Sequence, residues 1–146
     1  MLDDILEFLA AHDLCVLATA AGGVPHCSLM GYAMDHERRH LLLATLPETR
    51  KWRNIQESPD VSILVDNREA LPDLGRDALT AVTISGRLRP FHDPSGEAAA
   101  KALLAGRLGS LGGILERPES RVARIRILAL QILKGPVQAM RFTLPD

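Results

Sequence analysis

The stretch Leu41-Leu-Leu-Ala-Thr-Leu-Pro-Glu-Thr-Arg-Lys-Trp-Arg-Asn-Ile55 decides how the middle of this chain folds. Its first four residues are apolar and predict a buried strand, which leads directly into a helix expected over residues 45–57. Thr45 and Glu48 stand three residues apart, as in a capping box, and Pro47 suits a first helical turn. The stretch therefore predicts a strand joined to a helix by almost no loop.

The charge at the start of this expected helix is opposite to the usual one. A helix N-terminus exposes N–H groups and favours negative charge, yet Arg50, Lys51 and Arg53 follow at once. A basic cluster is favourable there if a phosphate binds to the N–H groups, nearby hydroxyls and cations together. The alternative is a set of solvated charges on a short surface helix. The segment thus predicts either an anion site or an ordinary charged surface.

Length and composition limit the class of protein. The 146 residues, of which 47% are hydrophobic and 24% charged, predict a single domain over residues 1–146 with a real core. A formal net charge of -1 does not favour nucleic acid or an anionic membrane as a partner. No run approaches the roughly 18 consecutive apolar residues of a membrane span, and the acidic N-terminus lacks signal-peptide features. With only Cys15 and Cys27, and no disulfide framework, we expect a reduced, cytoplasmic protein.

Outward from the central stretch, the chain predicts mostly strands. Helical spacing is expected over residues 3–11 and again over residues 94–104, where Asp93 precedes Pro94 as a cap. Residues 67–77 are expected to form a polar loop, and the glycines within 106–113 a flexible linker. Short connections between strands favour an antiparallel sheet that closes on itself, so a small β-barrel with helices over its openings is expected. The expected strands are 14–20, 24–34, 39–44, 61–66, 79–89, 121–133 and 137–142.

Six short motifs also occur in the order of a known family. They are Cys15-Val-Leu-Ala-Thr19, Gly23-Val-Pro-His-Cys-Ser28, Leu42-Leu-Ala-Thr45, Thr49-Arg-Lys51, Asn54-Ile55 and Ser58-Pro-Asp-Val-Ser62. In this order and spacing the chain resembles the pyridoxamine 5′-phosphate oxidase-like, FMN-binding split-barrel family. The spacing from Thr45 to the Arg50-Lys51 pair carries most of the resemblance.

The resemblance implies a mainly β protein: a split β-barrel of about six antiparallel strands with short covering helices. It also implies a homodimer with FMN sites at the interface between the two copies. The residues that would run beside the flavin ring are Cys27, Ser28, Leu29 and Met30, and those that would hold the phosphate are Thr45, Thr49, Arg50 and Lys51.

Three departures separate the chain from pyridoxamine 5′-phosphate oxidase itself. That enzyme has an arginine near the position of Cys27 and a lysine near that of Tyr32, and neither is present. Its C-terminal tail, which completes the vitamer site, is replaced by Met140-Arg-Phe-Thr-Leu-Pro-Asp146. Vitamin B6 oxidation is therefore not expected. The family also contains flavin reductases, deazaflavin-dependent reductases, nitroimidazole-resistance proteins and haem-handling proteins, and the fold does not choose among them.

Two classes of function follow from the resemblance. The first is an FMN-dependent oxidoreductase that transfers electrons from a nicotinamide or another small-molecule donor, with the chemistry carried by the cofactor. The second is a non-enzymatic protein of the same fold that binds flavin or haem as a carrier, buffer or sensor.

Other reactive residues give weaker signals. His26, Cys27 and Ser28 alternate between strand faces and form no catalytic relay, so Cys27 is expected to be a small packed residue. The five histidines show no metal-ligand spacing, and no metal site is expected. Trp52 is expected in the core or an interface. Arg124 and Arg126 share one strand face, which could either extend an anion site at a dimer interface or be solvated.

Overall fold

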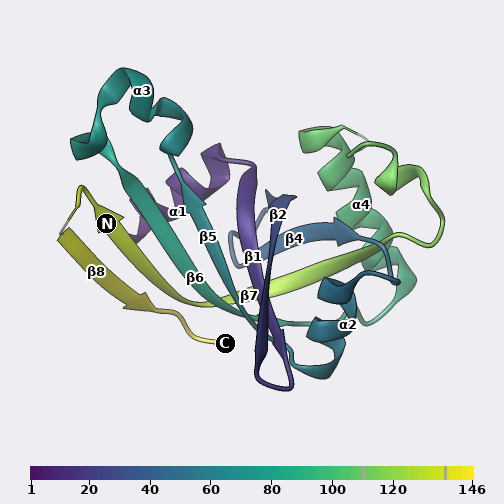
Figure 1. Cartoon of the computed structure of the whole chain (residues 1–146). Helices are drawn as coiled ribbons and strands as arrows, with labels where there is room; N and C mark the ends of the chain where they lie inside the picture. The colour runs from purple at the N-terminus through teal and green to yellow at the C-terminus, as the bar shows by residue number, and fades with distance from the viewer. Residues whose placement is uncertain (110, 137) are drawn as a thin grey trace.

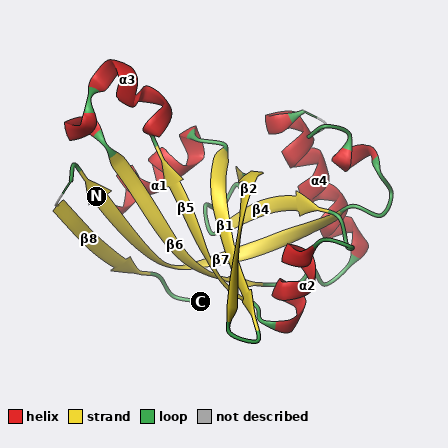
Figure 2. Ribbon diagram, viewed as in Figure 1, coloured by secondary structure: helices red, strands yellow, loops and turns green. Residues whose placement is uncertain are grey.

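One curled antiparallel sheet makes up most of this computed structural model, which describes residues 1–109, 111–136 and 138–146 (Figure 1). The strands are β1 (Leu14–Ala21), β2 (Val24–Gly31), β3 (Ala33–Met34), β4 (His40–Thr45), β5 (Asp60–Asp66), β6 (Thr80–Leu88), β7 (Arg121–Lys134) and β8 (Gln138–Thr143). The helices are α1 (Leu2–Ala11), α2 (Arg50–Glu57), α3 (Leu71–Leu74) and α4 (Pro94–Leu108) (Figure 2).

The strand order is β2-β1-β5-β6-β7-β4-β3, with β8 paired to β7 outside this path. Every pair is antiparallel, so the expectation of a mainly β split barrel is confirmed. Among the described residues, no helix is both long enough and apolar enough to cross a membrane.

The two ends of this path, β2 and β3, are consecutive in the chain, and the expected single strand 24–34 divides between them. The Tyr32 N–H still donates to the Asp13 carbonyl at 2.9 Å, which continues the register of the β1–β2 pair by one residue. Its hydroxyl donates to the Leu9 carbonyl at 2.6 Å, and the side chain is fully buried. After Tyr32 the chain leaves its pairing with β1, and Ala33 and Met34 pair with β4. The open seam of the barrel lies between these two pairings.

The main core fills the inner face of the curled sheet. Alternate residues of the strands point inward, as Ile63, Ile84 and Leu130 do, all fully buried. Ile5 and Leu9 from α1 and Trp52 and Ile55 from α2 belong to the same cluster, which confirms the expectation that Trp52 is a core residue. Burial raises the pKa of the Cys15 thiol to about 12, so this cysteine stays protonated in the core.

A second, smaller core lies on the outer face of the sheet under α4 (Figure 1). Ala100 and Leu104 of the helix pack there against Leu42, Ala44 and Val122 of β4 and β7. The helix is longer than expected, since it continues through Gly106 to Leu108 and ends at Gly109 with a positive φ of 71°. The expected flexible linker over 106–113 is thus wrong for its first part, and residue 110 lies outside the described residues.

Two other segments differ from expectation. The polar loop expected over 67–77 contains three short helical turns, at Arg68–Ala70, α3 and Arg76–Ala78. They form because Asn67 fixes both ends of the segment: its side chain donates to the Ala78 carbonyl at 2.9 Å and accepts from the Thr80 amide at 2.8 Å. The last expected strand, 137–142, corresponds to β8, and residue 137 lies outside the described residues.

Gly86 sits at the irregularity where the register between β6 and β7 shifts. A Cβ atom at this residue would lie 2.4 Å from Ile125 Cγ2 and 3.0 Å from the Arg126 carbonyl oxygen. Gly86→Ala should therefore lower the free energy of unfolding by about 1–3 kcal/mol, measured by urea denaturation. Gly106→Ala is the matched control, because no heavy atom lies within 4 Å of its Cβ and alanine favours the helix. Equal stability of Gly86→Ala and the wild type would contradict this packing.

Candidate cofactor site

The connection between β4 and α2 is longer than the sequence predicts. Thr45 is the last residue of β4, where it pairs with Arg121, so it cannot also cap a helix. The helix begins at Arg50 with Thr49 as its N-cap, whose hydroxyl oxygen accepts from the Trp52 amide at 3.3 Å. The expected capping box of Thr45 and Glu48 is therefore wrong, because strand pairing holds Thr45 in the extended conformation.

The two threonine hydroxyls form a short chain of hydrogen bonds. Thr49 donates its hydroxyl hydrogen to the Leu46 carbonyl at 2.8 Å, and its oxygen lies 3.1 Å from that of Thr45. Since the Thr49 hydrogen is already used, Thr45 is the donor between them. Thr49 is held by its bonds to the Leu46 carbonyl and the Trp52 amide. The Thr45 hydroxyl has only its bond to Thr49, so it can exchange that bond for one to a ligand without disturbing the helix cap.

A cavity of about 210 Å³ opens where β2 and β4 diverge at the seam. One wall comes from the end of β2 and the other from the end of β4 and the start of α2. Leu111 and Ile114, from the segment after α4, complete the lining. Five of the eight site residues expected from the sequence line this cavity: Leu29, Met30, Thr45, Thr49 and Lys51.

The other three expected residues do not line this cavity. Arg50 is exposed on α2, and Ser28 is half-buried on β2. Cys27 is exposed, so the expectation of a packed cysteine is wrong. The reason is the strand alternation: Cys27 is paired with Ala18, on the outer face of the β1–β2 pair, which no described element covers.

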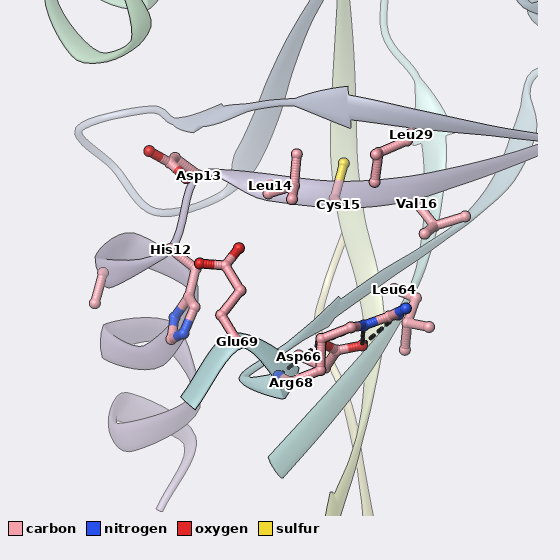
Figure 3. A pocket seen from close by; sticks show the side chains of 11 residues that line it. His12, Asp13, Leu14, Cys15, Val16, Leu29, Leu64, Asp66, Arg68 and Glu69 are labelled. Atoms are coloured by element: carbon pink, nitrogen blue, oxygen red, sulfur yellow. Dashed lines mark hydrogen bonds and ion pairs between the residues drawn. The ribbon is translucent and has the colours of Figure 1, made fainter. Parts of the chain in front are cut away.

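This outer face carries apolar side chains where a solvated strand surface would carry polar ones. Val16 is the cross-strand partner of both Leu29 and Leu64, so the three form one row across β2, β1 and β5. Leu29 is 71% exposed. Figure 3 shows this row beside a second cavity, of about 330 Å³, which Leu14 and His12 also line. Leu29 lines both cavities and therefore marks the place where they adjoin.

Four charged residues also line the second cavity: Asp13, Asp66, Arg68 and Glu69 (Figure 3). Hydrogen bonds from Arg68 hold the pKa of Asp66 below its usual value, so this pair neutralises itself. Two contacts with Phe8 hold the imidazole of His12 in place. Its Nδ1 lies 2.7 Å from the Phe8 carbonyl oxygen, and its ring packs against the Phe8 ring. Sequence reasoning missed this cavity, although the apolar Leu14 and Val16 on a strand with an apolar inner face were a signal for it.

Arg124 and Arg126 do not form a solvated face. Arg126 is only 7% exposed, and its guanidinium donates to the Pro145 carbonyl at 2.6 Å. Arg124 lies over the Phe91 ring, 5.0 Å from its centroid. Of the two alternatives, a solvated face is therefore wrong for Arg126. Neither residue lines the seam cavity, and an anion site extended across a dimer interface stays a prediction.

The fold is that of a split-barrel protein, and known proteins with this fold lead to the same class. The profile of the pyridoxamine 5′-phosphate oxidase family matches residues 1–134. The chain therefore belongs to this family, and the resemblance seen in its sequence is confirmed. None of the curated proteins matches the sequence.

Solved structures with related folds carry different ligand names. A heme-binding protein from Mycobacterium smegmatis superposes with a TM-score of 0.80 at 20% identity, over 94% of this chain and 56% of that one. An FAD-binding protein from Mesorhizobium loti superposes with a TM-score of 0.74 at 22% identity, over 90% of this chain and 93% of that one. A putative pyridoxamine 5′-phosphate oxidase from Listeria innocua superposes with a TM-score of 0.69 at 21% identity, over 91% of this chain and 98% of that one. At these identities the similarity establishes the fold alone. The chain spans little more than half the length of the mycobacterial protein.

Proposed function

We propose that this protein is a homodimeric FMN-binding flavoprotein that acts as an oxidoreductase on a small-molecule donor. The observation that carries the proposal is the seam cavity, where the Thr45 hydroxyl, the Lys51 side chain and the first turn of α2 converge. These are the donors that a phosphate monoester requires: a hydroxyl, an ammonium group and helix N-terminal amides.

Backbone amides, a cation and a hydroxyl would together hold the phosphate end of the cofactor. Thr49 is already engaged as the N-cap, which keeps the first turn of α2 in place. Among the described residues, the Arg50 and Lys51 amides have no intrachain acceptor, and both belong to that turn. The Lys51 ammonium supplies charge, and Thr45 supplies a hydroxyl that can rotate toward the ligand. Arg50 would contribute through its backbone and its long-range charge.

The flavin ring would lie outside the seam cavity. A volume of about 210 Å³ falls below the roughly 300–1,000 Å³ of pockets that enclose small-molecule ligands, so it suits the phosphate end alone. The adjoining apolar surface around Leu29 would support the ring, and a second copy of the chain would cover it. This arrangement explains why an apolar row of Leu29, Val16 and Leu64 faces outward.

When bound, the cofactor would supply the electron-transfer chemistry. The contribution of the chain is to bind the phosphate, orient the ring and exclude water from it. Pyridoxamine 5′-phosphate is not the proposed substrate. Cys27 and Tyr32 stand where that oxidase has basic residues, and the Tyr32 hydroxyl is committed to the Leu9 carbonyl inside the core.

Haem binding is the second candidate, favoured by one observation. His12 borders the second cavity, whose lining is partly apolar and partly charged. Its Nδ1 lies within hydrogen-bond distance of a backbone carbonyl, an arrangement typical of a histidine that binds metal through Nε2. The mycobacterial structure described as a heme-binding protein has the same fold. In this case His12 would be the residue that binds the haem iron.

The visible spectrum of the purified full chain distinguishes the candidates. Absorption bands of oxidised flavin, bleached by NADH, NADPH or dithionite, are the expected result; bleaching by a nicotinamide supports an enzyme, and bleaching by dithionite alone supports a carrier. A Soret band that is lost in His12→Ala would establish the haem alternative and contradict the flavin proposal.

A further inference from the structure

A third cavity, of about 640 Å³, lies beside α4 and is open to solvent. Its floor is Leu42 of β4, and α4 forms one wall with Ala99, Ala100 and Leu103. None of its lining residues lines the seam cavity. Its volume lies within the range of small-molecule sites, and the lining from these elements is apolar.

One cation, Arg124, borders this apolar lining, and its guanidinium is held in a fixed position. Nε donates to the Arg89 carbonyl at 3.0 Å, and Nη2 donates to the Pro90 carbonyl at 3.0 Å. The guanidinium also lies on the Phe91 ring, 5.0 Å from its centroid. These contacts orient the group without neutralising it, since carbonyls and a ring carry no net charge.

Arg124 has no carboxylate partner within 4.0 Å among the described residues. The one carboxylate that also lines the cavity, Asp35, is already engaged. It accepts from the Arg39 and His40 amides at 2.8 and 3.0 Å and lies 2.8 Å from His40 Nδ1. Burial raises its pKa, but these hydrogen bonds outweigh burial and hold the pKa below its usual value. The Nη1 group of Arg124 remains available for an anion.

We propose that this cavity binds a small aliphatic carboxylate, with its anionic head on Arg124 and its chain along α4 over Leu42. The Nη1 group, left unused by the Arg89 and Pro90 carbonyls, supplies the head-group contact. The side chains that β4 and α4 contribute to the lining are aliphatic, whereas Asp35 and His36 line it from the turn before β4. The guanidinium already covers one face of Phe91, which favours an alkyl chain over an aromatic ring. This site is separate from the proposed flavin site.

Isothermal titration of the purified full chain with decanoate and with decanol tests this assignment, because the two probes differ only in the head group. Decanoate should bind about ten- to a hundredfold more tightly than decanol. Arg124→Gln should abolish this difference, and Ala99→Trp, which fills the cavity, should weaken both probes. Arg141→Gln, at an exposed arginine of β8, is the matched control and should leave decanoate binding unchanged.

The wild-type comparison decides the question even if Arg124→Gln fails to fold. Equal affinity for decanoate and decanol, or no binding of decanoate, would overturn the proposal. A change of oligomeric state in Ala99→Trp would also overturn it, by assigning this face to contact with a second copy of the chain. FMN affinity should be unchanged in Ala99→Trp, so failure here and failure of the flavin proposal are distinguishable.

Discussion

Lys51→Ala should weaken FMN binding about ten- to a hundredfold and leave riboflavin binding unchanged. The Lys51 side chain lines the seam cavity beside Thr45 and the first turn of α2, where the phosphate would sit. Its removal deletes a charge-assisted contact that only the phosphorylated flavin can make. Quenching of flavin fluorescence during titration with each ligand measures both affinities.

Arg50→Ala is the matched control for this prediction. Arg50 is the neighbouring cation on the same helix, but it is exposed and does not line the cavity, so its loss should cost less than the loss of Lys51. Thr45→Val should fall between the two, because it removes the rotatable hydroxyl and leaves the N-cap at Thr49 intact. A parallel loss of FMN and riboflavin affinity in Lys51→Ala would indicate general destabilisation and contradict a phosphate role.

Leu29→Glu should separate the two copies of the proposed dimer and leave each copy folded. Leu29 is 71% exposed in the isolated chain, so a charge there costs little in the monomer. In a dimer it would be buried without a partner, which should raise the dissociation constant about thirtyfold or more. Analytical ultracentrifugation across micromolar concentrations, together with thermal unfolding, measures the two effects.

Leu74→Glu is the control for the dimer prediction. Leu74 lies on α3, is 61% exposed and is outside the row of Leu29, Val16 and Leu64. The same substitution there should leave the oligomeric state unchanged. Because Leu29 also adjoins the seam cavity, Leu29→Glu should weaken FMN binding as well. A wild-type chain that sediments as a monomer would contradict both the dimer and the ring position.

The sequence predicts much of this fold because the inner face of the barrel is encoded by local patterns. Alternation in β6 identifies Val82 and Ile84 as inward residues, and both are fully buried. The seven predicted strands appear as eight because the segment 24–34 changes its partner strand at Tyr32, from β1 to β4. This change depends on pairing with two other strands, so no pattern within the segment reveals the break.

The candidate site was predictable in chemistry but not in detail. The unusual cations at a helix start indicated an anion, and Lys51 does line a cavity with Thr45 and Thr49. Which threonine caps the helix depended on Thr45 pairing with Arg121, a residue 76 positions later in the chain. Lys51 lines the cavity and Arg50 is exposed because α2 begins at Arg50. The sequence placed this start at residue 45, since it assigned the cap to Thr45 rather than to Thr49.

The most direct test of the central claim compares FMN with riboflavin on the wild-type chain by fluorescence quenching. The seam cavity as a phosphate site predicts that FMN binds about ten- to a hundredfold more tightly than riboflavin, and more tightly than FAD. Equal affinities for FMN and riboflavin, or no binding of either, would show that the cations at the start of α2 form only a charged surface.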